Sequence, residues 1–283
     1  MKKTQASQTA MGTAALRAIE SEKPAGERVC YDPLARKFIS SWFYFQVRLF
    51  ARISEWFTHG GPSFVIWRSR YIDDYLQECR KAGTTQVVIL GAGLDSRAYR
   101  DELLSGTFTT FEVDYPATQA SKIKQVKKIF GAIPASVVYV PIDFNIETLD
   151  KLYSFGYDRS LKTLFIWEGV TLYLEEEAVN ATLTWVRMNA APGSSIIFDY
   201  QDTSTLTRRN IAYRVLNQLT GEKRVFGIEK EQMEAFLTQK GFTHMVDVTA
   251  EKLKSLYCKG SNQLRPVAIY YSIVHAEVGE SRM

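Results

Sequence analysis

Cysteine and histidine are both scarce in this chain, which has three of each among its 283 residues. The cysteines lie far apart without a C-x-x-C pair, and the histidines show no spacing typical of metal ligands. These residues are Cys30, Cys79, Cys258, His59, His244 and His275. The sequence therefore predicts isolated thiols in a reducing compartment and no metal site.

Long apolar runs are also missing. No stretch approaches the ~18 consecutive apolar residues of a membrane-spanning helix. The N-terminal stretch MKKTQASQTAMGTAAL lacks the apolar core of a signal peptide. We therefore expect a cytoplasmic protein without stable membrane association.

The charge of the chain does not indicate nucleic-acid binding, since the formal net charge is only +4. The most basic stretch, SKIKQVKKIF at 121–130, also carries Ile123, Val126 and Ile129 at near-helical spacing. Its lysines are therefore expected on the solvated face of a helix, and no nucleic-acid partner is predicted.

Hydrophobic residues make up 46% of the chain, which is enough for a sizeable core. Residues 1–82 show only helical patterns, at 13–21, 32–57 and 63–82, and the break HGGP separates the last two. We expect this part to pack on the core as an N-terminal helical lid. Residues 83–283 are expected to form one ligand-binding domain.

Strand patterns begin at Gln86 and alternate with helical ones. Five such strands and two more near the C-terminus predict an α/β fold of the Rossmann-like type. Its sheet would be seven-stranded and mostly parallel, with an antiparallel last strand. The patterns are QVVILG, FTTFEVD, SVVYVPID, TLFIWE and SSIIFDY, then a strand near 245–248 and a final one at 266–274.

The first strand pattern ends in a glycine turn, which contains Gly91, Ala92 and Gly93. A dinucleotide-binding turn has a third glycine where this chain has Ser96, and the helix that follows receives pyrophosphate at its N-terminus. Asp95 would in addition repel a phosphate there. We therefore expect a nucleoside ligand without phosphate.

Asp114 ends the second strand pattern, 21 residues after Gly93, where an acid can accept hydrogen bonds from both ribose hydroxyls. S-adenosylmethionine fits this description, because it joins adenosine to a methionine tail with a carboxylate, an ammonium and a sulfonium. Asp143 could contact the adenine amino group or the ribose, beside the apolar wall of Phe144. It could equally cap the following turn.

The tail of such a ligand needs charged partners. Glu168 directly follows a buried strand, where an acid is costly to leave unpaired, so we favour a role at the ammonium over a helix cap or an ordinary salt bridge. An arginine can bind the carboxylate bidentately, and Arg68 and Arg70 are the candidates. Their spacing equally allows ion pairs with Asp73 and Asp74.

Three stretches in order, VVILGAGLDSRAYR, TFEVDYP and LFIWEGVTLYLEEEAV, resemble the leucine carboxyl methyltransferase family, which also includes many bacterial small-molecule O-methyltransferases. The resemblance begins at TAALRAIES and CYDPLARKF, passes through RSRYIDDYL and continues to APGSSIIFDY. It implies the fold and activity of a class I S-adenosylmethionine-dependent methyltransferase.

The resemblance also implies roles for single residues. Glu168 matches the acid at the ammonium, Asp114 the ribose acid, and Arg70 the carboxylate-binding arginine. The other matches are Arg17 as a second basic residue at that carboxylate, Gly91, Ala92 and Gly93 as the turn beneath the methionine portion, Asp143 with Phe144 as the adenine-side pair, and Tyr173 as the aromatic residue near the reaction centre. For Arg97 we expect a structural ion pair, with Asp95 or Asp114.

Two further segments each allow two interpretations. The stretch WFYFQVRLFARISEWF at 42–57, with Arg48 and Arg52, could lie on a membrane surface. We favour an aromatic lid or core helix, because the upper edge of the sheet needs a wall that excludes water. Residues 203–226, which contain four arginines, could bind an acidic substrate or form a solvated helix.

The favoured function is O-methylation of a small organic molecule at a carboxylate or hydroxyl oxygen, by in-line displacement. A carboxylate acceptor needs no general base, in agreement with the lack of a histidine marked as a base, whereas a hydroxyl acceptor would need one. A protein C-terminal carboxyl group is the alternative acceptor. An NAD-binding oxidoreductase and a non-catalytic nucleotide-binding module are the alternative classes.

Overall fold

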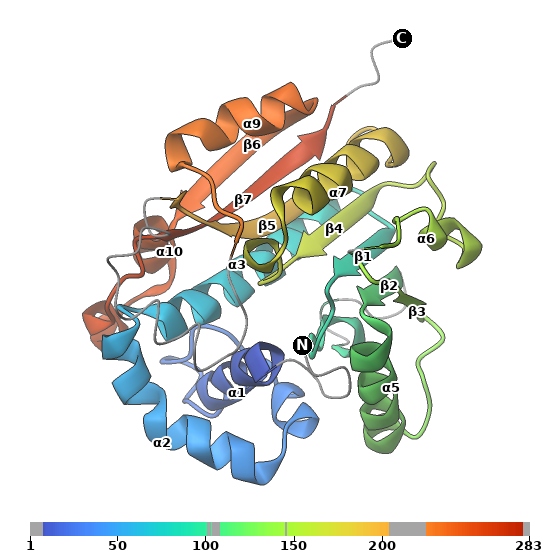
Figure 1. The fold of residues 1–283 in the computed structure, drawn as a ribbon. Helices are drawn as coiled ribbons and strands as arrows, with labels where there is room; N and C mark the ends of the chain where they lie inside the picture. The colour runs from blue at the N-terminus through green and yellow to red at the C-terminus, as the bar shows by residue number, and fades with distance from the viewer. Residues whose placement is uncertain (1–7, 101–102, 104–107, 145, 204–224, 280–283) are drawn as a thin grey trace.

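Seven strands form one sheet, in the order β3-β2-β1-β4-β5-β7-β6 (Figure 1). Neighbouring strands are parallel except at β7, which runs antiparallel to β5 and to β6. The strands are β1 (Gln86–Leu90), β2 (Thr109–Asp114), β3 (Val137–Pro141), β4 (Thr163–Trp167), β5 (Ser195–Gln201), β6 (Phe242–Thr249) and β7 (Tyr271–Val278). The predicted seven-stranded, mostly parallel sheet with an antiparallel last strand is confirmed.

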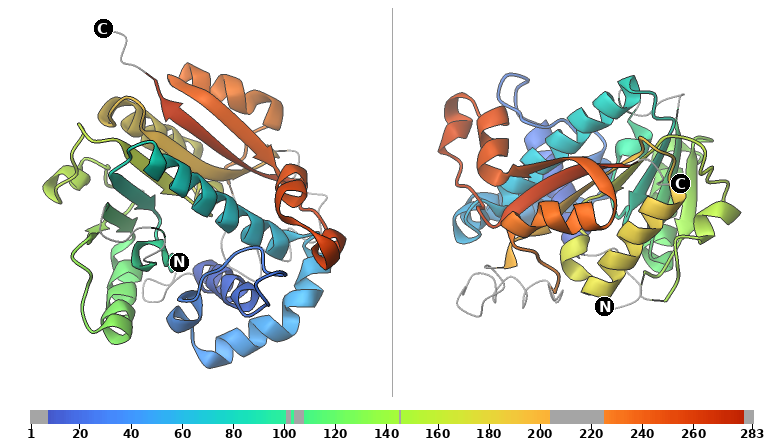
Figure 2. Two further views of the ribbon diagram at one scale, coloured as in Figure 1. Left: turned by 180° about the vertical axis from the view of Figure 1, so that it is seen from behind. Right: turned by 90° about the horizontal axis from the view of Figure 1, so that it is seen from above.

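The computed structural model describes residues 8–100, 103, 108–144, 146–203 and 225–279, so most of the ambiguous segment at 203–226 lies outside the described residues. Helices cover both faces of the sheet (Figures 1 and 2). The α-helices are α1 (Gln8–Ser21), α2 (Ser41–Phe57), α3 (Gly61–Lys81), α5 (Pro116–Phe130), α6 (Lys151–Ser154), α7 (Glu176–Asn189), α9 (Met233–Gln239) and α10 (Ala250–Tyr257). The 3-10 turns are η1 (Ala35–Phe38), η2 (Arg97–Tyr99), η3 (Thr171–Tyr173), η5 (Lys230–Gln232) and η6 (Gly260–Leu264). Over this part of the chain, no helix combines the length and the hydropathy needed to cross a membrane.

Successive side chains of β1 belong alternately to two apolar clusters, one on each face of the sheet. Val87 and Ile89 belong to the cluster under α3 and α10, whereas Val88 and Leu90 belong to the cluster under α7 and α9. This alternation follows from the period of two in a strand. Because both faces are buried, the strands read as continuous apolar runs, which explains why their positions could be predicted.

A third apolar cluster joins the N-terminal helices to the region after β1. Ala14 of α1 packs in it with Phe38 of η1 and Val126 of α5. Ala10 Cβ lies 3.2 Å from the position that a Cβ of Gly93 would take. The first helix therefore covers the glycine turn directly.

The aromatic segment that the sequence predicts as one helix from residue 32 is divided in two. η1 ends at Phe38, and α2 begins after Ser40, which has an extended backbone. The Ser40 Oγ accepts a hydrogen bond from the Phe43 N–H at 3.2 Å. The prediction of one helix is wrong because this serine caps a new helix, and its cap satisfies an N–H group that has no partner within the helix.

The last strand also differs from its predicted position. The sequence predicts residues 266–274, but β7 begins at Tyr271 and continues to Val278. The N–H groups of Ile269 and Tyr271 donate to the carbonyls of Val267 and Ala268, both at 3.0 Å. These tight turns occupy the backbone before β7, although its side chains have the pattern of a strand.

α2 has apolar residues on both sides. Phe43, Tyr44 and Val47 pack inward on the cluster that contains α1, whereas Trp42 and Trp56 are 70% and 73% exposed. Both α1 and α3 contact α2, and Figures 1 and 2 show it at the edge of the molecule, away from the strands. The outward side of α2 is therefore not part of a core among the described residues, and the role of α2 as a lid over the active site stays a prediction.

Gly91→Ala tests how closely the glycine turn approaches Val170. Gly91 has φ +67°, and an added Cβ would lie 2.4 Å from Val170 Cγ2; Gly83 has φ +88° with no atom within 4 Å of its added Cβ. Gly83→Ala should lower the free energy of unfolding by about 1–2 kcal/mol for the left-handed backbone alone. Gly91→Ala should lower it by at least ~1 kcal/mol more, because of overpacking. Chemical denaturation measures both.

A Val170→Ala background is the control, in which Gly91→Ala should cost about as much as Gly83→Ala. If the extra cost of Gly91→Ala is unchanged in that background, contact with Val170 is not its cause.

Candidate functional site

The glycine turn follows β1 where the strand order reverses, between β1 and β4. Ligands of open α/β sheets bind outside the carboxyl ends of the strands at such a point. Gly91 and Gly93 have φ values of +67° and +41°, a conformation that favours glycine. The N–H groups of Gly91 and Ala92 donate to Val113 O at 2.8 and 3.0 Å, which holds the turn against β2.

Asp114 is the last residue of β2 and contacts this turn. Its carboxylate accepts hydrogen bonds from the N–H groups of Gly93 and Tyr115, the latter at 2.6 Å. Burial raises the pKa of Asp114, and the two N–H groups partly offset this rise. The structure thus places an anchored carboxyl group at the carboxyl edge of the sheet, where hydroxyl groups of a ligand could donate to it.

Glu168 directly follows β4, and its side chain is buried between cations. Its Oε1 accepts from Arg68 Nε at 3.0 Å and from Ser69 Oγ at 2.9 Å, and its Oε2 accepts from Arg97 Nη1 at 2.7 Å. Burial alone would raise the pKa of Glu168, but the guanidinium groups of Arg97 and Arg68 outweigh it and hold the pKa well below its ordinary range. Glu168 is therefore a buried carboxylate that stays ionised.

Arg68 connects α3 to the ends of two strands. Besides Glu168, its guanidinium pairs with Asp199 of β5, with 2.6 Å between Nη1 and Oδ2. The other oxygen of Asp199 accepts from the Gly169 N–H at 2.6 Å. Burial raises the pKa of Asp199, and the charge of Arg68 partly offsets this. One arginine thus holds the carboxyl ends of β4 and β5 together.

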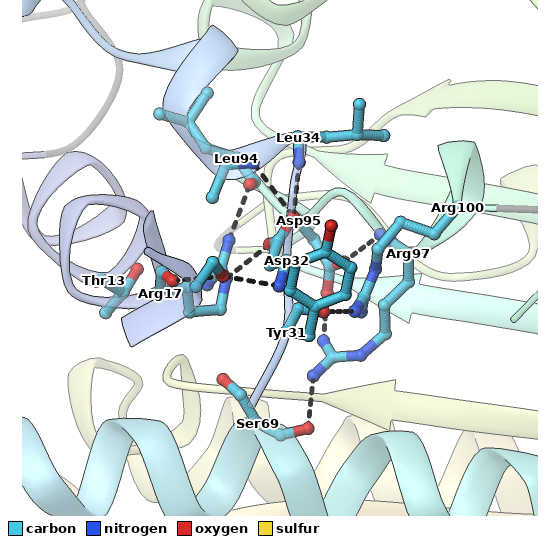
Figure 3. A network of polar contacts seen from close by, with 12 residues as sticks. Thr13, Arg17, Tyr31, Asp32, Leu34, Ser69, Leu94, Asp95, Arg97 and Arg100 are labelled. Atoms are coloured by element: carbon cyan, nitrogen blue, oxygen red, sulfur yellow. Dashed lines mark hydrogen bonds and ion pairs between the residues drawn. The ribbon is translucent and has the colours of Figure 1, made fainter. Parts of the chain in front are cut away.

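Arg97 connects the glycine turn to α3. Its guanidinium pairs with Asp95 in the turn, with Asp73 of α3 at 2.6 Å and with Glu168 at 2.7 Å. It also donates to the backbone carbonyl of Ser69 at 3.3 Å (Figure 3). The expected ion pair between Arg97 and Asp95 is confirmed, and the contact with Glu168 adds a link that spacing did not indicate.

Arg17 connects α1 to the same turn. Its Nε pairs with Asp32 Oδ2 at 2.9 Å, and its Nη2 donates to Leu94 O at 2.9 Å (Figure 3). Burial would raise the pKa of Asp32, but the charges of Arg17 and Arg100 outweigh it and lower this pKa. Because Leu94 directly follows Gly93, α1 is tied to the turn by a buried guanidinium.

Arg70 lies outside this network. Its Nε pairs with Asp74 Oδ1 at 2.8 Å, its Nη1 donates to Val29 O at 3.3 Å, and 46% of its side chain is exposed. This is the i,i+4 ion pair that its spacing allowed. Arg68, two residues earlier, reaches Glu168 instead, and the role of Arg70 at a ligand carboxylate stays a prediction.

Three further predicted site residues follow β3 and β4. Asp143 comes after β3, where its N–H donates to Glu147 Oε2 at 2.9 Å and its carbonyl accepts from the Glu147 N–H at 2.9 Å. Phe144 is half-buried and packs on the cluster under α7. Tyr173 is half-buried at the end of η3. Asp143 therefore takes part in a turn, and the ligand roles of all three stay predictions.

Besides Asp32, the partner of Arg17, three charged residues of the network were not predicted as part of the site. They are Asp199, Asp73 and Arg100, the last of which pairs with Asp73 at 2.9 Å. The sequence itself indicated a buried partner for Asp199, because an acid inside the apolar run IIFDY must be paired once the strand is buried. No such indication existed for Asp73 and Arg100, since their partners lie on other elements.

The leucine carboxyl methyltransferase family model matches residues 10–187 of this chain. The protein YktD of Bacillus subtilis, whose name places it among S-adenosyl-L-methionine-dependent methyltransferases, is 32% identical over 64% of this chain and 58% of its own length. A Mycobacterium avium protein with a name of the same kind is 28% identical over 96% of this chain and 91% of its own. The match thus spans less than two thirds of the first relative and most of the second.

Solved structures of low identity share the fold. A Thermobifida fusca protein named as a methyltransferase has a TM-score of 0.63 at 14% identity, over 99% of this chain and 97% of that one. A DUF574 family protein from Streptomyces avermitilis has a TM-score of 0.58 at 13% identity, over 94% and 96%. At such identities the likeness concerns the fold alone.

Glu168→Gln should destabilise the protein most near neutral pH. Because the pKa of Glu168 is depressed in the folded state, its ionisation contributes stability above the unfolded pKa, and this contribution is lost as pH falls through the folded value. The loss in unfolding free energy should be on the order of 3 kcal/mol near neutrality, since the buried Arg68 and Arg97 each lose one of their carboxylate partners. It should shrink as pH falls below the ordinary value of 4.5.

Chemical denaturation across a pH series measures this difference. Glu177→Gln, at an exposed position of α7, is the matched control. A loss for Glu168→Gln that stays constant into the acid range would contradict the ionised assignment.

Proposed function

The chain belongs to the leucine carboxyl methyltransferase family, and we propose that it transfers the methyl group of S-adenosylmethionine to a carboxylate or hydroxyl oxygen of a small organic molecule. The observation that carries this proposal is Glu168, a buried carboxylate that stays ionised at the carboxyl end of β4. A buried anion at this point suits a cationic ligand group, such as the ammonium of a methionine tail.

The residues present fit the rest of the cofactor. β2 and β4 lie on either side of β1, so Asp114 and Glu168 flank the glycine turn. In the proposed arrangement, Asp114 accepts from the ribose hydroxyls, Glu168 accepts from the ammonium, and the turn forms the floor between them. We assign Gly91, Ala92 and Gly93 to this floor. We assign Asp143 and Phe144 to the adenine side of the cofactor.

The glycine turn is poorly suited to bind the pyrophosphate of NAD. The turn leads into η2, a 3-10 turn of three residues, where a dinucleotide site has the N-terminus of a long helix. Asp95 is neutralised by Arg97, so its charge would repel phosphate less than the sequence suggests. The described residues 94–100, directly after the turn, begin no α-helix, and this is the stronger support for a phosphate-free cofactor.

For the tail carboxylate we favour Arg68, with Arg17 as the second cation. The ammonium and the carboxylate of an amino acid share one carbon, so their protein partners must be neighbours. Arg68 Nε is 3.0 Å from Glu168 Oε1, and a planar guanidinium binds a carboxylate bidentately. Arg70, which pairs with Asp74 on an exposed face, is the alternative.

In the proposed reaction, the protein mainly has to position the reacting groups. When bound, the cofactor supplies an electrophilic methyl group on its sulfonium. The chain must hold the acceptor oxygen about 3 Å from that carbon, in line with the bond that breaks, and exclude water. A carboxylate acceptor is already ionised at neutral pH and needs no base. For a hydroxyl acceptor, Tyr173 is the residue we propose to orient it.

Transfer of a labelled methyl group tests the proposed function. The purified protein and labelled S-adenosylmethionine are incubated separately with the small-molecule and the protein fractions of a cell extract. We expect label in the small-molecule fraction. Mild alkali would release it from a methyl ester and would leave it on a methyl ether, which distinguishes the two acceptor oxygens.

Asp114→Ala is the control for this assay. It should abolish both transfer and calorimetric binding of S-adenosylhomocysteine, and keep the circular dichroism of the wild type. Label in the protein fraction alone would favour a protein C-terminal carboxyl acceptor. Label in neither fraction, together with binding of NAD, would overturn the proposal.

Arg68→Lys and Arg70→Lys are a matched pair for the tail carboxylate. Both keep the positive charge, so the buried Glu168 retains a cation, but the forked guanidinium is lost. Arg68→Lys should weaken binding of S-adenosylhomocysteine at least about tenfold, or about 1.4 kcal/mol, and Arg70→Lys should leave it within about twofold. Calorimetric titration measures both, and the reverse order would assign the carboxylate to Arg70.

A further inference from the structure

The outward side of α2 is an unusually apolar surface. Seven large apolar side chains on this helix are each more than half exposed, while its inward side packs on the cluster that contains α1. The exposed fractions are Trp42 70%, Phe45 58%, Leu49 61%, Phe50 56%, Ile53 52%, Trp56 73% and Phe57 71%. These side chains do not hold α2 to its own protein, so they require another explanation.

The size of this surface points to a partner. The five exposed aromatic side chains present roughly 500–800 Å², taking ~150–250 Å² for each whole side chain. The largest apolar patch on a typical monomer is about 300–600 Å². α2 reaches the upper part of this range or exceeds it before Leu49 and Ile53 are added.

The spacing of the exposed residues suggests which partner. Trp42, Phe45, Leu49, Ile53 and Trp56 are separated by three, four, four and three residues, and we call them the outward stripe. With 3.6 residues per turn, they lie along one side of the helix. Their order of spacings is the same in both directions, so a second α2 running antiparallel presents a matching stripe.

We propose that α2 forms the interface of a homodimer, in which the outward stripes of two copies pack antiparallel about a two-fold axis at Leu49. The axis places Leu49 against the partner's Leu49, Phe45 against the partner's Ile53, and Trp42 against the partner's Trp56. Such an isologous contact closes on itself and gives a dimer, not a filament. Trp42, Phe45 and Trp56 of the two stripes together expose about 600–1,000 Å² of aromatic surface, and Leu49 and Ile53 add to it, so the contact lies close to the ~1,200 Å² of the smallest stable interfaces.

The position of α2 permits this contact. Figures 1 and 2 show the helix along the edge of the molecule, with α1 and α3 on its inner side and the strands beyond them. A second copy can therefore approach α2 without touching the carboxyl edge of the sheet. The dimer interface is separate from the site around the glycine turn.

An anionic membrane is the competing occupant, because interfacial helices combine exposed aromatic residues with basic ones. Arg48 is beside the outward stripe, but its guanidinium already pairs with Glu22 and lies over the ring of Tyr44. An arginine neutralised within its own chain adds little attraction to anionic lipids. The matching spacing of the outward stripe therefore favours a second copy.

Light scattering on the full chain across a concentration series tests the proposal. The wild type should have twice the mass of one chain. Leu49→Asp should weaken the self-association about 100-fold or more, because the axis brings the two introduced carboxylates together in an apolar interface. Leu264→Asp, at a residue of η6 that is 85% exposed, is the matched control and should leave the mass unchanged. Both positions are exposed, so circular dichroism should match the wild type.

Cysteine cross-linking tests the register of the dimer. The three native cysteines are buried, so the introduced thiols are the accessible ones. Leu49→Cys should form a disulfide between chains, since the axis brings these positions together. Phe45→Cys should not, because it faces the partner's Ile53, and the double variant Phe45→Cys with Ile53→Cys should.

Three results would overturn the homodimer. The first is a monomer at every concentration. The second is a dimer that Leu49→Asp leaves intact, which would place the interface elsewhere. The third is a monomeric wild type that pellets with phosphatidylserine vesicles and loses this binding on Leu49→Asp, which would assign the outward stripe to lipid.

Discussion

The ion pairs around Glu168 determine much of the rest of this structure. A carboxylate without water is costly in a protein interior, and it persists only where cations and hydrogen-bond donors surround it. Here Arg68, Arg97 and Ser69 surround it, and they come from α3 and from the turn after β1. Because Arg68 also binds Asp199, the same charges align the ends of β4 and β5. Loss of one partner would leave the others buried with fewer opposite charges, since Arg68 would keep only Asp199 if Glu168 were lost.

This network has the mixed charge that an amino-acid ligand needs. In the proposed function, a zwitterionic tail meets Glu168 and Arg68 side by side, so both ends of the tail find partners that are already oriented. Preorganised charges need little rearrangement when the ligand arrives. Arg17 extends the network to α1, so the helix over the glycine turn is tied to the same charges that would hold the tail. In the proposed function, cofactor binding and the position of α1 would therefore be physically connected.

The parts that could be predicted from sequence have local causes. Buried parallel strands appear in the sequence as apolar runs, and the glycine turn is recognised from its own residues. The sheet was therefore predictable. Arg70 shows what the sequence pattern could not predict. Arg68 and Arg70 are two residues apart, so they point about 200° apart on the helix, and their spacing does not say which one faces the sheet. The exposed side of α2 shows another limit. Aromatic residues at helical spacing describe an apolar face, but not whether this chain or another molecule covers it.

The sequence by itself determined the class of fold, the family and the positions of Gly91, Asp114 and Glu168 at the ends of strands. These depend on short-range patterns and on the order of motifs. Only the tertiary structure decided which charges meet, because Arg68 and Asp199 are 131 residues apart and pair only once α3 lies on the sheet. The free energy of a buried ion pair depends on distance, burial and surrounding charges. None of these is a property of the residues alone.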